Sequence, residues 1–89
     1  MSGAMNMPVM YEVNGYDRAS GELVKTYDVP AHRISFVLRT ARVPASDGYG
    51  SYPLTPGQLA EIGALLETEI EPDNLDFFLE PYAMLGGFG

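Results

Sequence analysis

The chain has 89 residues, enough for one small domain, and its hydrophobic fraction of 46% argues against extensive disorder. It has no cysteine, which excludes disulfides and thiolate metal sites. The net charge of −7 is unevenly spread: five basic and four acidic residues precede Val43, whereas eight acidic and no basic residues follow Arg42. Because phosphate would be repelled by the acidic half, we expect no nucleic-acid partner and instead a cationic protein.

The ends of the chain and its hydropathy predict a cytoplasmic protein without a membrane partner. No window approaches the ~18 apolar residues of a membrane span, and the first residues lack the basic and apolar regions of a signal peptide. Three methionines within seven residues suggest that residues 1–6 are a disordered tail or a cloning remnant. We expect a single α+β domain over residues 7–82 and a flexible Gly-rich tail over 83–89.

Residues 7–29 have the pattern of a β-hairpin. Tyr11 and Val13 alternate with polar neighbours at the period of a strand, and the segment 17–21 (DRASG) combines an Asp and a Gly that favour chain reversal. The second strand, 22–29, alternates as well. We expect its odd-numbered face, Leu23 to Val29, to be buried, with the stem of Lys25 along the margin.

Residues 31–42 follow Pro30 and can be read in two ways. Ile34, Val37, Leu38 and Ala41 share one helical face, which predicts a helix, although Phe36 lies outside that stripe. The run ISFVLRT is also rich in strand-forming residues, so a further strand is the alternative. The segment 43–53 that follows is long for a connection and reads as a loop with two tyrosines.

The clearest local signal is the start of a second helix at Thr55. The sequence Thr55-Pro56-Gly57-Gln58 combines an N-cap residue, a first-turn proline and a T-x-x-Q capping box. Leu59, Ile62, Leu65 and Leu66 then form the apolar stripe of this helix.

The last predicted element is a strand over residues 75–80. Leu75, Phe77 and Leu79 alternate with Asp76, Phe78 and Glu80, and we expect Pro81 to end the strand. The predicted fold is therefore α+β: a three-stranded, mainly antiparallel sheet, made of the hairpin and this strand, with two helices on one face in the order β-β-α-α-β. The other face of the sheet stays exposed or binds a partner.

No pattern in the chain carries recognisable catalytic chemistry. His32 is the one histidine and has no partner at a characteristic spacing, and no phosphate-binding or nucleophile motif occurs. The stretch 69–80 matches a calcium-binding EF-hand loop only in part, because Asn74 stands where that loop requires glycine. We therefore expect no catalytic residue, no metal and no cofactor.

The acidic second half can be a solvated surface or a binding surface. As a binding surface, it would pair carboxylates, which steer a cationic partner, with aromatic side chains that fill pockets. Phe78 supports this reading, since it is apolar on the acidic side of its strand. The predicted partner-binding residues are Tyr49, Tyr52, Glu67, Glu69, Glu71, Asp73, Asp76, Phe78 and Glu80.

The patterns GYD at 15–17, SGEL at 20–23, YPLT at 52–55 and DFFLE at 76–80 resemble small uncharacterised bacterial domains of unknown function. Some acidic proteins of this size act as immunity proteins beside toxins, and the resemblance supplies no catalytic residue. We expect a non-enzymatic protein-binding domain, most concretely an immunity-type inhibitor that occludes a basic toxin domain. The alternative is a structural or accessory domain that forms a homodimer through the exposed sheet face or a strand edge.

Overall fold

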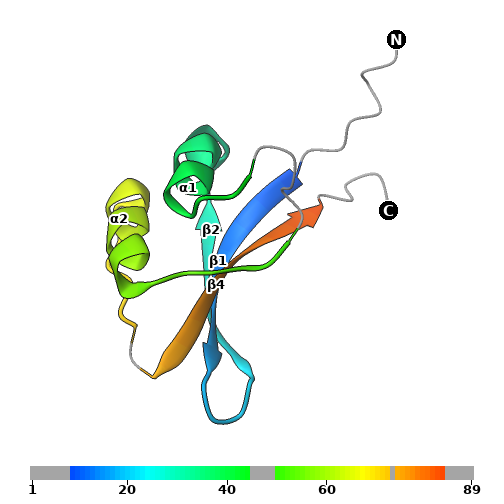
Figure 1. The fold of residues 1–89 in the computed structure, drawn as a ribbon, viewed down its shortest axis with the longest axis vertical. Coiled ribbons are helices and arrows are strands. Elements are labelled where there is room, and N and C mark those ends of the chain that lie inside the picture. The colour runs from blue at the N-terminus through cyan, green and yellow to red at the C-terminus, as the bar shows by residue number, and fades with distance from the viewer. Residues whose placement is uncertain (1–8, 45–49, 73, 84–89) are drawn as a thin grey trace.

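The computed structural model describes residues 9–44, 50–72 and 74–83, as an antiparallel sheet with two helices on one side (Figure 1). The predicted tail at 1–6, and residues 84–89 of the predicted C-terminal tail, lie outside this description. The strand order in the sheet is β2-β1-β4-β3. In chain order the elements are β1 (Val9–Asp17), β2 (Leu23–Val29), the 3₁₀ turn η2 (Ala31–Arg33), α1 (Ile34–Thr40), β3 (Tyr52–Pro53), α2 (Pro56–Leu66) and β4 (Leu75–Ala83).

The prediction of a three-stranded sheet in the order β-β-α-α-β is wrong. A fourth strand, β3, comes from the segment that the sequence suggested was only a loop, and it lies between the two helices in chain order. Tyr52 pairs with Leu79, and Pro53 pairs with Phe78. Two residues are too few to show the period-two pattern of a strand. A proline cannot donate a backbone hydrogen bond, so it is tolerated in a sheet only where no such bond is needed, as on this edge strand.

The last strand does not end at Pro81 as predicted, because β4 continues to Ala83. Leu54 donates its backbone N–H to the carbonyl of Phe77, which shows that odd-numbered residues of β4 direct their backbone polar groups toward β3. Pro81 has the same parity and lies beyond the end of β3. Its missing N–H therefore interrupts no hydrogen bond to β1, and β4 continues past Pro81.

The predicted hairpin forms, with β1 and β2 antiparallel, but the predicted burial of the odd-numbered face of β2 fails at Leu23. The register slips between Gly15, which pairs with Lys25, and Tyr16, which pairs with Leu23, so that Val24 is an extra residue. Such a bulge breaks the alternation of faces. Val29 is buried as expected, whereas Leu23 is 54% exposed and Val24 is 52% exposed.

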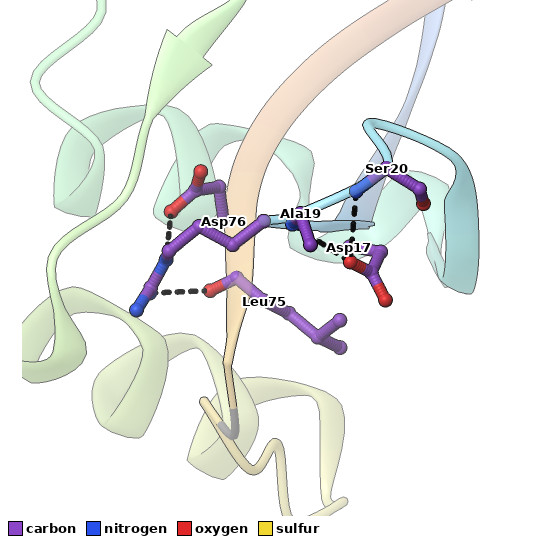
Figure 2. A network of polar contacts seen from close by, with 6 residues as sticks. Asp17, Ala19, Ser20, Leu75 and Asp76 are labelled. Carbon is purple, nitrogen blue, oxygen red and sulfur yellow. Dashed lines mark hydrogen bonds and ion pairs between the residues drawn. The ribbon is translucent and has the colours of Figure 1, made fainter.

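The turn of the hairpin is held by the aspartate that the sequence indicated. The Asp17 carboxylate accepts backbone N–H bonds from Ala19 at 2.8 Å and Ser20 at 3.0 Å (Figure 2), and the bonds from Ser20 and Ala19 lower the pKa of Asp17. Gly21 has a φ of 76°, the left-handed conformation that favours glycine. Arg18 then ties the turn to β4, through the Asp76 carboxylate and the Leu75 carbonyl.

The helical reading of residues 31–42 is confirmed by η2 and α1. Val37 and Ala41 are buried, and Ile34 and Leu38 pack against the core, as the stripe predicts. The capping box of α2 is also confirmed: Gln58 donates its N–H to Thr55 Oγ1, and the Gln58 side chain accepts the Thr55 N–H. Neither helix of the described residues is long and apolar enough to cross a membrane.

The two helices are antiparallel neighbours, and their contacts fix them over the sheet. At one end, Gln58 of α2 donates to the Thr40 carbonyl of α1 at 3.1 Å. At the other end, Arg33 and Glu67 form an ion pair at 3.8 Å. The core between helices and sheet contains Val13, Val29, Val37, Ile62 and Leu79, all of them fully buried. This packing uses one face of the sheet, and no helix of the described residues covers the other (Figure 1).

Candidate functional site

The open face is the side of the sheet opposite α1 and α2, and its residues alternate with those of the core. Tyr11 and Val13 of β1, and Phe77 and Leu79 of β4, are buried beneath the helices. Their neighbours point the other way, because successive side chains of a strand lie on opposite faces. The open face thus contains Glu12, Asn14 and Tyr16 of β1, Thr26 and Asp28 of β2, and Asp76, Phe78, Glu80 and Tyr82 of β4.

Three carboxylates form a row across the centre of the open face. Glu12 of β1 pairs with Asp28 on one side and with Glu80 on the other. Neighbouring strands lie about 4.8 Å apart, so the row spans roughly 10 Å. Within the described residues, no lysine or arginine pairs with any of these carboxylates. Like charges directly opposite one another destabilise a sheet, so the repulsion within this acidic row opposes folding.

Asn14 lies beside the acidic row and links it to β2. Its Nδ2 donates to Glu12 Oε1 at 3.1 Å and to Glu80 Oε1 at 2.8 Å. Its Oδ1 accepts from the Thr26 hydroxyl at 2.8 Å. Asn14 is only 4% exposed, and these bonds satisfy its amide. The amide therefore bridges two carboxylates that would otherwise repel each other directly.

Glu80 receives three hydrogen bonds, from Tyr16 OH, Asn14 Nδ2 and Ser51 Oγ. Desolvation opposes its charge, but the bonds from Tyr16, Asn14 and Ser51 outweigh it and hold the pKa of Glu80 below its ordinary value. The same bond to Glu80, followed by desolvation, raises the pKa of Tyr16. Desolvation, and then the charges of Asp28 and Glu12, raise the pKa of Tyr82. Glu80 is thus ionised at neutral pH, and the Tyr16 and Tyr82 hydroxyls beside the row are neutral.

One end of the open face carries an apolar cluster beside the ion pair of Arg18 and Asp76. The rings of Tyr16 and Phe78 meet edge to face, with centroids 5.9 Å apart. The bulge in β2 places Leu23 opposite Tyr16, and Val24 follows it; both are more than half exposed. An exposed apolar cluster beside unneutralised charges is typical of a protein-binding surface, in which aromatic and aliphatic side chains anchor a partner.

A serine hydroxyl contacts the acidic row. Ser51 donates to Glu80 at 2.8 Å, but a carboxylate with a lowered pKa is a weak base for activating a hydroxyl. Among the described residues, no group of three or more His, Asp or Glu side chains is arranged to hold a metal ion. His32 is exposed in η2, the turn that leads directly into α1.

The structure brings together only part of the predicted binding surface. Asp76, Phe78 and Glu80 lie on the open face, and Asp76 pairs with Arg18 at 3.1 Å. Tyr52 packs against the core instead. Glu67 ends α2, and Glu69 and Glu71 follow it in the exposed connection to β4. Tyr49 and Asp73 lie outside the described residues.

The sequence interpretation missed the first-half members of this surface, namely Glu12, Asn14, Tyr16 and Asp28. The first three stand at period two in one strand, and that signal could have marked them as a polar face. The hairpin turn could also have indicated that Glu12 faces Asp28. That Glu80 completes the row depends on β4 pairing with β1, which no local pattern reveals.

A family model for a domain of unknown function, DUF7683, matches residues 10–80. The chain belongs to this family. The match runs from the second residue of β1 into β4, so it includes the acidic row and both helices. No curated protein and no solved structure matches the chain.

Proposed function

We propose that this DUF7683 chain is a non-enzymatic protein-binding domain whose open face receives a cationic protein. The observation that carries the proposal is the acidic row: Asp28, Glu12 and Glu80 lie side by side, and no basic side chain of the described residues neutralises them. A basic partner would relieve their mutual repulsion and would be steered toward them by the net charge of −7.

The apolar end of the open face supports the same function. Charges set the rate and orientation of an encounter, whereas buried anchors supply most of the binding free energy. Phe78, two residues from Glu80, offers such an anchor, and Leu23 with its neighbour Val24 offers others at the end of the face where Leu23 pairs with Tyr16. In its most specific form, the proposal is an immunity-type inhibitor that covers the cationic cleft of a basic bacterial toxin and so keeps substrate out.

Two triple variants with the same change in net charge test this proposal. The first, Glu12→Gln/Asp28→Asn/Glu80→Gln, neutralises the acidic row. The second, Glu67→Gln/Glu69→Gln/Glu71→Gln, neutralises three carboxylates of the α2–β4 connection and is the matched control. Both raise the net charge by three from −7, so any difference between them reports on position and not on total charge.

The measurement is capture of basic proteins from the source cell at low and high salt, followed by titration of the captured protein. We expect the control to bind like the parent chain and the acidic-row variant to bind at least tenfold more weakly, with a loss of salt dependence. Equal weakening by both variants, or none by either, would refute a local acidic site. Near-ultraviolet circular dichroism verifies that each variant is folded.

The toxin-inhibitor form has its own test. Co-expression of the chain with a basic toxin domain encoded beside its gene should restore growth, and the acidic-row variant should fail to restore it. If the neighbouring genes encode no basic domain, the inhibitor form is rejected, while binding of a cationic partner remains testable as above.

A further inference from the structure

The outer surface of the helix layer carries an apolar groove that the folding of one chain does not explain. Phe36 of α1 and Ala64 and Leu65 of α2 line it, with Arg39 and Glu61 at its rim. Phe36 is 46% exposed, because it lies outside the core-facing stripe of α1. Arg39 lies over that ring, 5.8 Å from its centroid. Phe36 therefore presents apolar surface to the outside of the molecule.

The charges at the rim indicate which occupant fits. Arg39 stands on the α1 side of the groove, and Glu61 stands on the α2 side. No ion pair joins them in the described part of the chain. A cationic occupant would meet Arg39, and an anionic occupant would meet Glu61, so either one places like charges together. A second copy of the groove, turned by a two-fold axis, presents the opposite charge to each.

We propose that this groove is the interface of a homodimer. Because α1 and α2 are antiparallel, a two-fold axis along the groove sets each α1 against the partner's α2. Arg39 of each copy then lies against the partner's Glu61, and Phe36 lies against the partner's Leu65. The interface is small: helices of 7 and 11 residues are only about 10 and 16 Å long. We therefore expect a weak dimer, with a dissociation constant of about 10 μM to 1 mM.

This inference is independent of the proposed function, since the helices cover the opposite side of the sheet from the acidic row (Figure 1). Variants separate the two. Phe36→Ala in the groove should weaken the dimer and leave binding of a cationic protein unchanged. Glu12→Gln/Asp28→Asn/Glu80→Gln should weaken that binding without weakening the dimer.

Sedimentation equilibrium of the full chain gives the test, with a monomer mass of 9.7 kDa. We expect Phe36→Ala to weaken the dimer at least tenfold, and Arg39→Glu or Glu61→Arg alone to abolish it. Mixing the two single charge variants should restore association, because each then supplies the charge that the other lacks. Lys25→Glu on β2 makes the same charge change as Arg39→Glu outside the groove and should leave the dimer intact, which excludes pairing through the β2 edge.

A monomer at millimolar concentration would overturn the proposal. So would a dimer that Phe36→Ala and Arg39→Glu leave unchanged, since its interface would then lie elsewhere. Failure of the mixed variants to associate would show that Arg39 does not face Glu61 of a second copy. Thermal melts of each variant exclude loss of the fold as the cause.

Discussion

The two faces of this sheet come from the same strands yet have opposite effects on the stability of the fold. Toward the helices, Val13 and Leu79 are neighbours in adjacent strands and are completely buried. One residue further along β1, Asn14 pairs with Phe78, and one residue back along β1, Glu12 pairs with Glu80. The first face removes apolar surface from water and stabilises the fold. The second places carboxylates side by side, where their mutual repulsion opposes folding.

This difference shows which residues the fold requires and which it merely holds in position. A chain of 89 residues has about 4 to 13 kcal/mol of stability in total. Keeping three like charges in a row is a cost that such a chain can bear only if the core offsets it. The contrast between the faces thus points to a role for the acidic row outside folding, and it leads to predictions of decreasing size.

The largest effect should follow from a cavity beneath the helices. Ile62 of α2 is fully buried against the sheet, so we expect Ile62→Ala to lower the free energy of unfolding by about 2–5 kcal/mol. Urea unfolding followed by circular dichroism measures this. Asp28→Asn on the open face is the comparison and should be neutral or slightly stabilising, because it removes one of three adjacent like charges. A large loss from Asp28→Asn would mean that the acidic row is structural.

The next effect concerns Gly15 of β1, which lies against the ring of Phe77 in the core. A Cβ atom at this position would lie 2.6 Å from Cε1 of Phe77. We expect Gly15→Ala to destabilise by about 1–3 kcal/mol through this overlap. In a Phe77→Leu background the same substitution should cost much less, because the clashing atoms are gone. Unfolding free energies of the four proteins form a double-mutant cycle, and additive effects would contradict the clash.

On the open face, Asn14 should matter more than its size suggests. We expect Asn14→Ala to lose about 1–2 kcal/mol at neutral pH, because Glu12 and Glu80 then face each other without a shared donor. Asn14→Asp is nearly isosteric and adds a fourth carboxylate, so it should lose more. Both losses should shrink in acid as the carboxylates protonate. Unfolding curves at neutral and acidic pH decide this, and a loss independent of pH would point to packing instead.

The smallest effect is on the titration of Glu80. The pKa of Glu80 in the folded chain is below the ordinary value, so its ionised carboxylate stabilises the fold. This contribution is fully present at a pH above the ordinary carboxyl pKa of about 4.3, and it is lost as the pH falls through the lowered pKa. Tyr16→Phe removes one of its three donors. We expect the pKa of Glu80 to rise and stability at neutral pH to fall by about 1 kcal/mol or less. Carbon-detected NMR titration of the Glu80 carboxyl measures the change, and Tyr82→Phe is the control.

Much of the local structure was predictable because its causes are local. The capping box at Thr55, the turn at Asp17 and the alternation of Phe77 and Leu79 with their polar neighbours are properties of short stretches. Two local predictions failed for identifiable reasons. A single extra residue, Val24, turned Leu23 outward, and Pro81 stayed within β4 because its missing N–H faces the side beyond the end of β3.

The sequence by itself determined the hairpin, the two helices and the start of β4, together with the apolar side of α1, α2 and β4, because periodicity and capping act within a few residues. Only the tertiary structure decided that β4 lies between β1 and β3, and so that Glu80 meets Glu12 and Asn14. Those contacts join residues 66 and 68 positions apart, and their register is set by how the whole apolar face packs beneath α1 and α2. The pairing register of β1 and β4 therefore creates the candidate site.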